Sequence, residues 1–274
     1  MEPVLYGMMN VRNEGEWIKE AIHALLQICD LVFVLDDDST DDTLTVCKSF
    51  GPRVLTWSKK DPSNDMDRAV RDRYPYSDFA ADKNFLYDRI LHLLPSALIN
   101  QVSPYWVVAM DGDEVLESPL DLREEVQLRT TEHGATHHSL SLQIKYLWDS
   151  GRQIRVDGCY SEMWRPSAFH VFNPAFRFEG TPFPFNLHQP NVPNELVGNH
   201  VRVLNCGVKH YGYRDRTTRL AKYARYLALD RNADGEDYYR HMVIGDLPSL
   251  PATAKTRYAG PLRLIPYGHT VEPT

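Results

Sequence analysis

The sequence runs Leu31-Val32-Phe33-Val34-Leu35 directly into Asp36-Asp37-Asp38-Ser39-Thr40-Asp41-Asp42, and Tyr105-Trp106-Val107-Val108-Ala109-Met110 directly into Asp111-Gly112-Asp113-Glu114. A short run of β-branched and aromatic residues is typical of a strand buried on both faces of a parallel sheet. Open sheets of this kind bind ligands at the carboxyl ends of their strands. The two runs therefore predict a ligand site at that edge, acidic enough to hold a metal ion together with a phosphorylated ligand.

The composition is that of an ordinary globular protein, since 43% of the 274 residues are hydrophobic and 24% are charged. The apolar stretches are far shorter than the roughly 20 residues that a membrane span needs, so we expect no anchor or signal peptide. The four cysteines stand far apart in the sequence, which predicts reduced thiols and a cytoplasmic protein rather than a disulfide framework or a zinc site.

Charge is distributed unevenly along the chain, although the net charge is −7. From His200 onward there are 12 lysines and arginines against 7 acidic residues, and the rest of the chain has 18 against 30. The basic end predicts contact with an anionic ligand, or peripheral contact with the inner face of a membrane; the alternative is a solvated helix face. The acidic body argues against specific nucleic-acid binding.

Strands and helices alternate in the first part of the chain. We expect strands at residues 4–9, 30–35, 53–57 and 105–110, and helices at 17–28, 43–50 and 79–94. This alternation predicts a parallel, doubly wound α/β sheet. The long polar segment 59–78 is expected to form a lid or an acceptor loop.

From about residue 135 the pattern changes to short alternating stretches broken by prolines, at 139–146, 161–164, 170–172 and 201–208. These predict mixed or antiparallel strands joined by long loops. A basic amphipathic helix is expected at 215–229, and the proline-rich end beyond Gly245 gives little signal.

The second acidic strand end suits a divalent cation. Asp111 and Asp113 flank a glycine, and Mg²⁺ or Mn²⁺ often takes one or two carboxylates while substrate phosphates and water fill the remaining positions. Gly112 lets backbone and ligand approach closely. A lone D-x-D string is common in acidic proteins, so the strength of this prediction comes from its place after a hydrophobic strand.

The first acidic strand end allows a different chemistry. Asp36, Asp38 and Thr40 fit the nucleophile motif of haloacid-dehalogenase-like phosphatases. That family places its nucleophile after the first strand of the domain, whereas a complete predicted strand and helix precede Asp36 in this chain. The phosphatase is therefore the weaker enzymatic alternative.

Taken together, the polar blocks resemble glycosyltransferase family 2. The blocks are Asn13-Glu14 after the first predicted strand, Asp36 to Thr43 after the second and Asp111 to Glu114 after the fourth. The stretch Ser77-Asp78-Phe79-Ala80-Ala81-Asp82-Lys83-Asn84-Phe85 resembles a helix of bacterial lipopolysaccharide-core-type sugar transferases in that family. The resemblance covers residues 3 to about 118 well and continues loosely to about 230.

The resemblance implies a GT-A fold with a nucleoside diphosphate sugar as donor and Mn²⁺ or Mg²⁺ as cofactor. Residues 1–118 would form the Rossmann-like half that binds the nucleotide-sugar, with a mostly parallel sheet flanked by helices. Residues 119–232 would form a mixed-strand, acceptor-side half, and residues 233–274 a C-terminal extension.

The resemblance also implies a nucleoside site. Asn10, Arg12 and Glu14 would border the nucleobase and ribose, and Asp36 or Asp37 would contact the edge of the base or of the ribose. Simpler interpretations remain open, because Arg12 would also pair with a nearby glutamate and Asp36 would also cap the helix that follows it.

A diphosphate and metal site is implied in the same way. Lys83, near the start of its helix, would approach the nucleotide or its pyrophosphate, and Asp111 with Gly112 would lie against the ribose or a metal-bound water. Asp113 would bind the metal, and His210 is placed like a third-ligand histidine, which favours Mn²⁺. Lys83 as a surface residue and His210 as a core histidine are the alternatives.

Inverting transfer, which the resemblance implies, needs a general base on the acceptor side. Relatives often have a His-Glu pair where this chain has His188-Gln189, and glutamine cannot accept a proton. The base must then be one of the other carboxylates, with Glu179 ranked first because it precedes a glycine on a predicted acceptor-side strand. The candidates are Glu179, Asp157, Glu162 and Glu195.

Two further points stay open at this stage. The acceptor is expected to be a glycan, a lipid-linked molecule or another hydroxyl compound. A nucleotide-sugar or metal-binding module without turnover is the alternative outside enzymology, because the residue expected to act as the base is Gln189.

Overall fold

The computed structural model describes residues 2–61, 79–95, 103–131, 138–179, 190–229 and 239–268. The predicted lid at 59–78 and the His188-Gln189 pair lie almost wholly or wholly outside these ranges. In the described part of the chain, no helix is long and apolar enough to cross a membrane.

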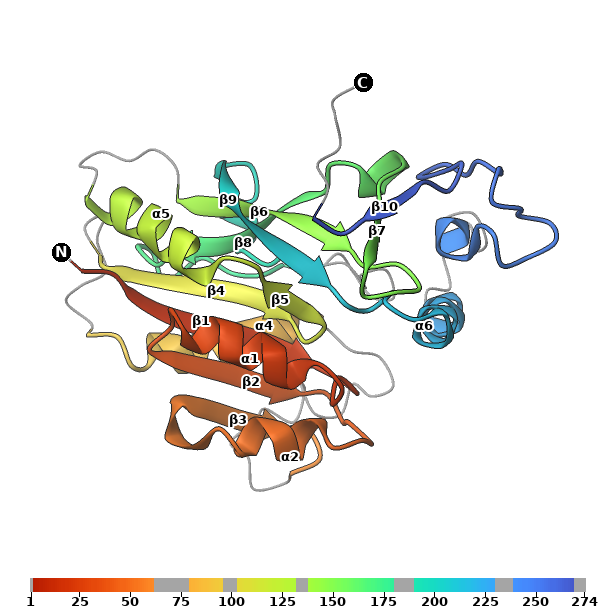
Figure 1. The fold of residues 1–274 in the computed structure, drawn as a ribbon. Coiled ribbons are helices and arrows are strands. Elements are labelled where there is room, and N and C mark those ends of the chain that lie inside the picture. Colours follow the sequence, from red (N-terminus) through yellow and green to blue (C-terminus); the bar gives the residue numbers. More distant parts are fainter. Residues whose placement is uncertain are drawn as a thin grey trace.

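The first part of the chain forms the predicted alternation of strands and helices (Figure 1). In chain order the elements are β1 (Val4–Val11), α1 (Ile18–Leu26), β2 (Leu31–Asp36), α2 (Thr43–Lys48), η1 (Gly51–Arg53), β3 (Val54–Ser58), α4 (Phe79–Leu91) and β4 (Tyr105–Asp111). Their bounds agree with the expected ranges to within a few residues, because strand and helix periods are both clear here.

The second part agrees less closely with the sequence pattern. Its elements are β5 (Glu114–Leu116), α5 (Pro119–Thr131), β6 (Ser139–Tyr146), β7 (Gln153–Arg155), η2 (Gly158–Tyr160), β8 (Trp164–His170), η3 (Asn194–Leu196), β9 (His200–His210), α6 (Arg216–Leu229), η4 (Arg240–Val243) and β10 (Leu264–Pro266). One strand, β8, replaces the two expected at 161–164 and 170–172, because Pro166 is accommodated at an irregularity in the β6–β8 pairing. Helix α5 was not expected, since its apolar stripe is narrow.

An eight-stranded mixed sheet carries the fold, in the order β3-β2-β1-β4-β8-β6-β9-β5. Strands β3, β2, β1 and β4 pair in parallel. Antiparallel pairs join β4 to β8, β8 to β6 and β9 to β5, while β6 and β9 are parallel. This arrangement confirms the predicted α/β fold, in which a parallel half continues into a half of mixed strands.

Helices cover both faces of the sheet, with α1, α2 and α5 on one side and α4 on the other (Figure 1). Alternate residues of each central strand enter opposite cores. In β1, Leu5 and Met9 pack with α1, whereas Tyr6 and Met8 pack with α4. Burial on both faces explains why these strands read as continuous apolar runs.

Strand register brings the polar ends of the parallel strands together. Asn10 of β1 is the Cα partner of Asp111 of β4, and Val11 is the partner of Asp36 of β2. The two acidic blocks, about 75 residues apart in sequence, therefore lie on either side of the end of β1.

The C-terminal residues 239–268 pack on the mixed-strand half. Tyr239 and Met242 join Trp148 and Tyr213 in a buried cluster, and β10 pairs with β7. Helix α6 lies beside this segment at the far end of the sheet (Figure 1). The described part of the predicted extension is thus continuous with the fold around α6.

Candidate functional site

A polar cluster lies where β1, β2 and β3 end, and we call it the Asp37 cluster. Lys59, just after β3, donates to Asp37 at 2.8 Å and to Asp82 of α4 at 2.7 Å. Asn10 donates through Nδ2 to Asp82 at 3.0 Å, and Arg12 approaches Asp37 at 3.5 Å. Three of the predicted nucleoside-site residues, Asn10, Arg12 and Asp37, are thus brought together.

The Asp37 cluster keeps unused hydrogen-bond acceptors. The Oδ1 atoms of Asn10 and Asp82 are buried and have no hydrogen-bond partner among the described residues. Burial raises the pKa of Asp82 to about 6, and Lys59 offsets only part of that effect. Buried acceptors without a partner are costly, so these two oxygens indicate a place where a ligand donates hydrogen bonds.

Asp36 points into the protein rather than into this cluster. It is 1% exposed, and its carboxylate accepts hydrogen bonds from Ser58 Oγ at 3.0 Å and from the Ser39 backbone at 3.3 Å. Asp37 is also buried, at 3% exposed, but it pairs with Arg12 and Lys59, so of the two alternatives it is the one that lies in the Asp37 cluster. The burial of Asp36 argues against the phosphatase, whose nucleophile must reach its substrate.

The rest of the first acidic block joins the loop after β2 to the loop after β1 through hydrogen bonds. Asp41 accepts hydrogen bonds from the Gly15 backbone and from Thr43, each at 3.0 Å or less. Asn13, at a φ of 55°, accepts one from the Thr40 backbone at 2.7 Å. These bonds fix the loop after β1, which carries Glu14 into the site.

A second group, the Asp113 cluster, consists of Glu14, Asp113, His210 and Lys222. The ammonium of Lys222 contacts Asp113 Oδ2 and lies 3.7 Å from Glu14 Oε1. His210 Nε2 lies 3.5 Å from the same Asp113 oxygen. Trp17 donates its indole N–H to Glu14. Three predicted residues, Glu14, Asp113 and His210, therefore lie together. Glu14 was expected beside the nucleobase with Asn10 and Arg12, but it contacts Lys222, which was not expected at Asp113.

Burial and neighbouring charges shift the pKa values of the carboxyl groups in the Asp113 cluster in opposite directions. Burial would raise the pKa of Asp113, but His210 and Lys222 hold it well below its usual range. Burial raises the pKa of Glu14 to about 8 despite the nearby Lys222. Burial also lowers the pKa of His210 to about 4, so its imidazole is neutral at pH 7. The cluster therefore has one firmly ionised pair, Asp113 with Lys222.

Asp111 faces a different cation. Arg165 of β8 pairs with Asp111 Oδ2 at 3.1 Å and with the carboxylate of Glu114, while Glu114 also accepts a hydrogen bond from the Asp111 backbone at 3.0 Å. Burial raises the pKa of Glu114 to about 7, and Arg165 counteracts it. Asp111 remains partly exposed, so a ligand at the end of β4 has access to it.

Two glycines make this close packing possible. A Cβ on Gly112 would lie 2.9 Å from Glu14 Cγ and from Val11 Cγ1. A Cβ on Gly212 would lie 2.2 Å from Asp113 Oδ2 and 2.5 Å from Lys222 Nζ. The predicted role of Gly112 in close approach therefore concerns the protein's own side chains, and Gly212 has the same role beside Lys222.

The expected metal ligands, Asp113 and His210, do not form a metal site in this geometry. Within the described residues, no group of three or more histidine, cysteine or carboxylate side chains has a metal-binding arrangement. Asp113 and His210 face each other, yet the Asp113 oxygen nearest His210 is in contact with the Lys222 ammonium. A divalent cation on that oxygen would have to displace Lys222, so the residues do not fit a resident cation in this arrangement.

Lys83 hydrogen-bonds to the segment before η3, although Asp111 and Asp82 are close enough to act on its pKa. Lys83 is buried and donates to Asn191 Oδ1 at 2.6 Å and to the Pro190 carbonyl at 2.9 Å, which fastens α4 to the segment before η3. Burial lowers its pKa to about 8. Glu179 is exposed, with its backbone bonded to Asn194. The predicted roles of Lys83 and Glu179 stay predictions.

Asp157 has a bonding pattern that makes it a weak proton acceptor. Its carboxylate accepts two hydrogen bonds from Arg155, both at 2.9 Å, and one each from the backbones of Gly260 and Arg263. Burial would raise its pKa, but these bonds lower it below the usual range. The contacts join β7 to the C-terminal segment, and thus give Asp157 a structural role.

Four site residues were missed or not placed by sequence reasoning: Lys59, Asp82, Arg165 and Lys222. Lys59 had a usable signal, because it follows the end of a parallel strand that neighbours β2. Lys222 lies on the predicted basic helix, for which an anionic ligand was expected, but its contact with Asp113 depends on long-range packing. Arg165 gave no signal, since it comes from antiparallel β8.

The basic helix α6 is largely paired within the protein. Arg219 bonds to Asp149 at 2.9 and 2.7 Å and also to Asp246, and Arg216 bonds to Asp246 at 2.6 Å. Lys222 also pairs with Asp113. Several basic residues that led us to expect an anionic partner or a membrane surface therefore form ion pairs within the protein. Peripheral membrane contact stays a prediction that these residues do not support.

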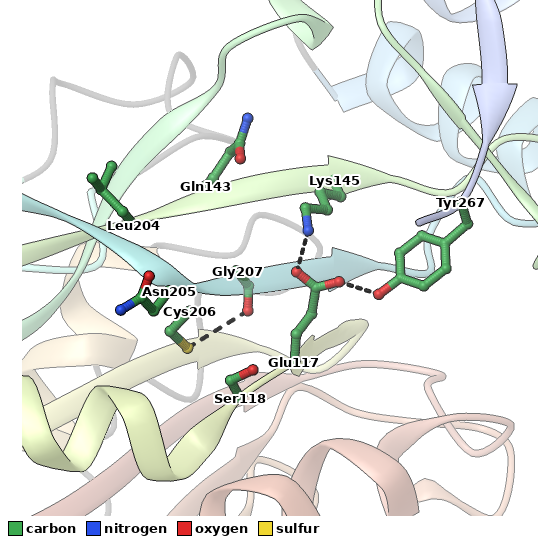
Figure 2. A pocket seen from close by; sticks show the side chains of 9 residues that line it. All are labelled: Glu117, Ser118, Gln143, Lys145, Leu204, Asn205, Cys206, Gly207 and Tyr267. Carbon is green, nitrogen blue, oxygen red and sulfur yellow. Dashed lines mark hydrogen bonds and ion pairs between the residues drawn. The ribbon is translucent and has the colours of Figure 1, made fainter. Parts of the chain in front are cut away.

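A separate pocket of about 340 Å³ lies along β9, and Figure 2 shows Glu117 between Lys145 and Tyr267 in its lining. Lys145 Nζ lies 2.7 Å from Glu117 Oε2, and the Tyr267 hydroxyl donates to Oε1. None of its lining residues belongs to the Asp37 or Asp113 cluster. It offers a chemically similar lysine–carboxylate pair outside the candidate site.

Comparison with known proteins gives distant relatives. No family model matches the chain. An uncharacterized glycosyltransferase of Rickettsia prowazekii is 28% identical over 136 residues, which are 50% of this chain and 36% of that protein. A second uncharacterized glycosyltransferase, of Rickettsia typhi, is 27% identical over 136 residues, with the same coverage. The chain thus matches little more than a third of the length of these relatives.

Solved structures show weaker likenesses. Glucosyl-3-phosphoglycerate synthase from Mycobacterium tuberculosis, in complex with Mn²⁺ and UDP-glucose, is 18% identical with a TM-score of 0.34, covering 53% of this chain and 44% of that one. TarS of S. aureus is 10% identical with a TM-score of 0.44, covering 92% and 45%. Neither likeness is strong enough to transfer a ligand or substrate. What stands is a similarity, over half of the chain, to curated bacterial glycosyltransferases.

Proposed function

We propose that the chain is a glycosyltransferase that transfers a sugar from a nucleoside diphosphate donor to a hydroxyl group of a glycan or lipid-linked acceptor. The observation that carries the proposal is the meeting of Asn10, Asp37 and Asp111 at the carboxyl edge of three neighbouring parallel strands. The similarity to curated bacterial glycosyltransferases supports it. The narrower lipopolysaccharide-core type remains a prediction, since the relatives are described only as glycosyltransferases.

The Asp37 cluster supports a nucleoside site. The unpartnered acceptors Asn10 Oδ1 and Asp82 Oδ1 suit donors such as ribose hydroxyls or a base N–H. Arg12 and Lys59 hold the Asp37 carboxylate on either side, so its position is set before a ligand arrives. A preorganised acceptor of this kind gives selectivity because an analogue that lacks the matching donor leaves it unpaired.

The neighbouring cluster supports a diphosphate site. In inverting transfer the acceptor oxygen forms a bond to the anomeric carbon while the bond from that carbon to the diphosphate oxygen breaks, so negative charge grows on the leaving diphosphate. Lys222, and Arg165 beside Asp111, are cationic side chains in and next to this cluster. A divalent cation held by Asp113 and His210 remains the prediction of the family resemblance.

The acceptor hydroxyl must lose a proton during transfer. We keep Glu179 as the candidate base, because its exposed side chain is able to meet an acceptor. Asp157 is a weaker candidate, since Arg155 and two backbone N–H groups already occupy its carboxylate.

A ligand screen on matched variants tests the proposal. Thermal unfolding is measured with UDP, GDP, dTDP, ADP or CDP, each with Mn²⁺ and with a chelator. At 100 times its dissociation constant, the correct nucleotide stabilises the protein by about 2.7 kcal/mol. Asp37→Asn should weaken this effect, whereas the control Asp38→Asn should preserve it. Among the described residues the Asp38 side chain pairs with the exposed Lys60 at 3.1 Å, and its φ of 65° also suits asparagine.

Turnover separates an enzyme from a binding module. The matching nucleotide-sugar should be slowly hydrolysed by the protein alone, with release of the nucleoside diphosphate. Binding without any hydrolysis or transfer would favour a module without turnover. Absence of binding by all five nucleotides, in either condition, would contradict the proposed function.

A further inference from the structure

Lys222 occupies the Asp113 oxygen that faces His210, and Asp113 and His210 are the two residues expected to hold a metal. Lys222 Nζ contacts Asp113 Oδ2, the oxygen that also lies 3.5 Å from His210 Nε2. A metal bridging Asp113 and His210 would sit within about 2.1 Å of that oxygen. Gly212 packs closely against this pair, since a Cβ placed there would lie 2.2 Å from the oxygen and 2.5 Å from Lys222 Nζ.

Lys222 is held in this position from its own helix. One turn earlier on α6, the guanidinium of Arg219 bonds to Asp149, to Asp246 and to the Met242 carbonyl. Arg219 is 1% exposed. The helix that presents Lys222 is therefore fastened on one side to the β6–β7 connection and on the other to the C-terminal segment.

The buried Asp113 carboxylate needs a cation at this point. The carboxyl group of Glu14 lies next to it, 3.7 Å from the Lys222 ammonium. Among the described residues, Lys222 is the basic side chain in direct contact with Asp113 apart from His210. An ammonium carries three N–H donors, so Lys222 is able to hold Asp113 and still donate to a phosphate oxygen.

We propose that the ammonium of Lys222, rather than a divalent cation, supplies the positive charge at Asp113 that receives the donor diphosphate. The identity of the ligand, a nucleoside diphosphate, rests on the proposed function. The competition between Lys222 and a metal ion for the Asp113 carboxylate does not depend on it. Nucleotide binding by this protein is then independent of added metal, although the resemblance implies a metal-dependent enzyme.

The first experiment uses the unmodified protein. Affinities for the five nucleoside diphosphates are measured by calorimetry in Mn²⁺ and in a chelator. We expect the best ligand to bind with dissociation constants that agree within about threefold between the two conditions. Binding that is about tenfold or more tighter in Mn²⁺ would overturn the proposal without harming the proposed function.

The second experiment compares two lysine variants, and Mn²⁺ alone is the probe. Lys222→Met frees Asp113, whereas the control Lys145→Met frees Glu117 in the pocket of Figure 2, away from the clusters. We expect Lys222→Met to bind Mn²⁺ at least about tenfold more tightly than the unmodified protein. Lys145→Met should behave as the unmodified protein does. Equal Mn²⁺ affinity in the unmodified protein and Lys222→Met would overturn the proposal.

Nucleotide binding by Lys222→Met completes the test. In a chelator the variant should lose about tenfold or more in nucleotide affinity, and Mn²⁺ should restore part of it. Undiminished binding in the chelator would contradict the role of Lys222. If no nucleotide binds to any form of the protein, the proposed function fails, but the Mn²⁺ titrations still decide whether Lys222 competes with a metal. If Lys222→Met fails to fold, the nucleotide affinities of the unmodified protein in Mn²⁺ and in a chelator decide whether Lys222 replaces the metal.

Discussion

Arg219 makes two hydrogen bonds with Asp149, at 2.9 and 2.7 Å, across 70 residues of sequence. The same guanidinium bonds to Asp246, so a single buried side chain joins α6 to two other segments. Because Lys222 follows one helical turn later, the position of its ammonium at Asp113 depends on this anchor. The electrostatics of the candidate site are thus set partly by residues outside it.

Arg219→Met is expected to destabilise the protein strongly, because it leaves Asp149 and Asp246 without their shared cation. Breaking a buried ion pair by removing one partner typically costs about 3–5 kcal/mol. Arg216→Met is the matched control, since Arg216 also pairs with Asp246 but is 61% exposed and should contribute less than about 1 kcal/mol. Chemical denaturation of both variants measures the difference. Equal, small effects would mean that Arg219 does not anchor the helix.

Gly212→Ala is expected to disturb the Asp113 cluster. Its new methyl group would lie 2.5 Å from Lys222 Nζ and 2.2 Å from Asp113 Oδ2, so the ion pair must shift. We expect about tenfold weaker nucleotide binding, measured by calorimetry. Gly198→Ala is the control, because a Cβ there meets nothing within 4 Å. Nucleotide affinity unchanged by Gly212→Ala would argue that the pair is not at the binding site.

Asp82 should make stability depend on pH. Its folded-state pKa is raised to about 6 from 3.8, chiefly by burial, so the folded protein binds a proton that the unfolded chain has released between these values. Its contribution to stability is complete below pH 3.8 and is lost as the pH rises through about 6. The loss amounts to at most about 3 kcal/mol.

Asp82→Asn removes this titration while keeping the shape of the side chain. The free energy of unfolding of the variant, relative to that of the unmodified protein, should therefore increase between pH 4 and pH 7, within the range set by the pKa of about 6. Urea denaturation at several pH values measures it. A constant difference across this range would show that Asp82 does not titrate as its burial implies.

Two carboxylate variants separate catalysis from structure on the acceptor side. Glu179→Gln should leave the melting temperature unchanged, because the Glu179 side chain is exposed, and should lower transfer about 100-fold if Glu179 is the base. Asp157→Asn should lower stability by about 1–3 kcal/mol, because its carboxylate bonds the buried Arg155 and two backbone N–H groups. Transfer within a few fold of normal in Glu179→Gln would exclude that residue as the base.

The sequence alone predicted the parallel half of the sheet and the edge on which the site lies. A continuous apolar run predicts a strand that is buried on both faces, and the aspartate that follows marks where the strand ends, as at Asp36 and Asp111. Both features are local in the sequence. The grouping of Asn10, Arg12 and Asp37, and the contact between Asp113 and His210, also agree with where the sequence placed them.

Only the tertiary structure decided which acidic residues face the site and which cation they meet. Asp36 and Asp37 are adjacent in sequence, yet one is bonded to Ser58 inside the protein and the other to Lys59 at the edge. Lys222 reaches Asp113 across 109 residues because α6 is fastened by Arg219. Such contacts depend on the packing of distant elements, and no local pattern of residues encodes them.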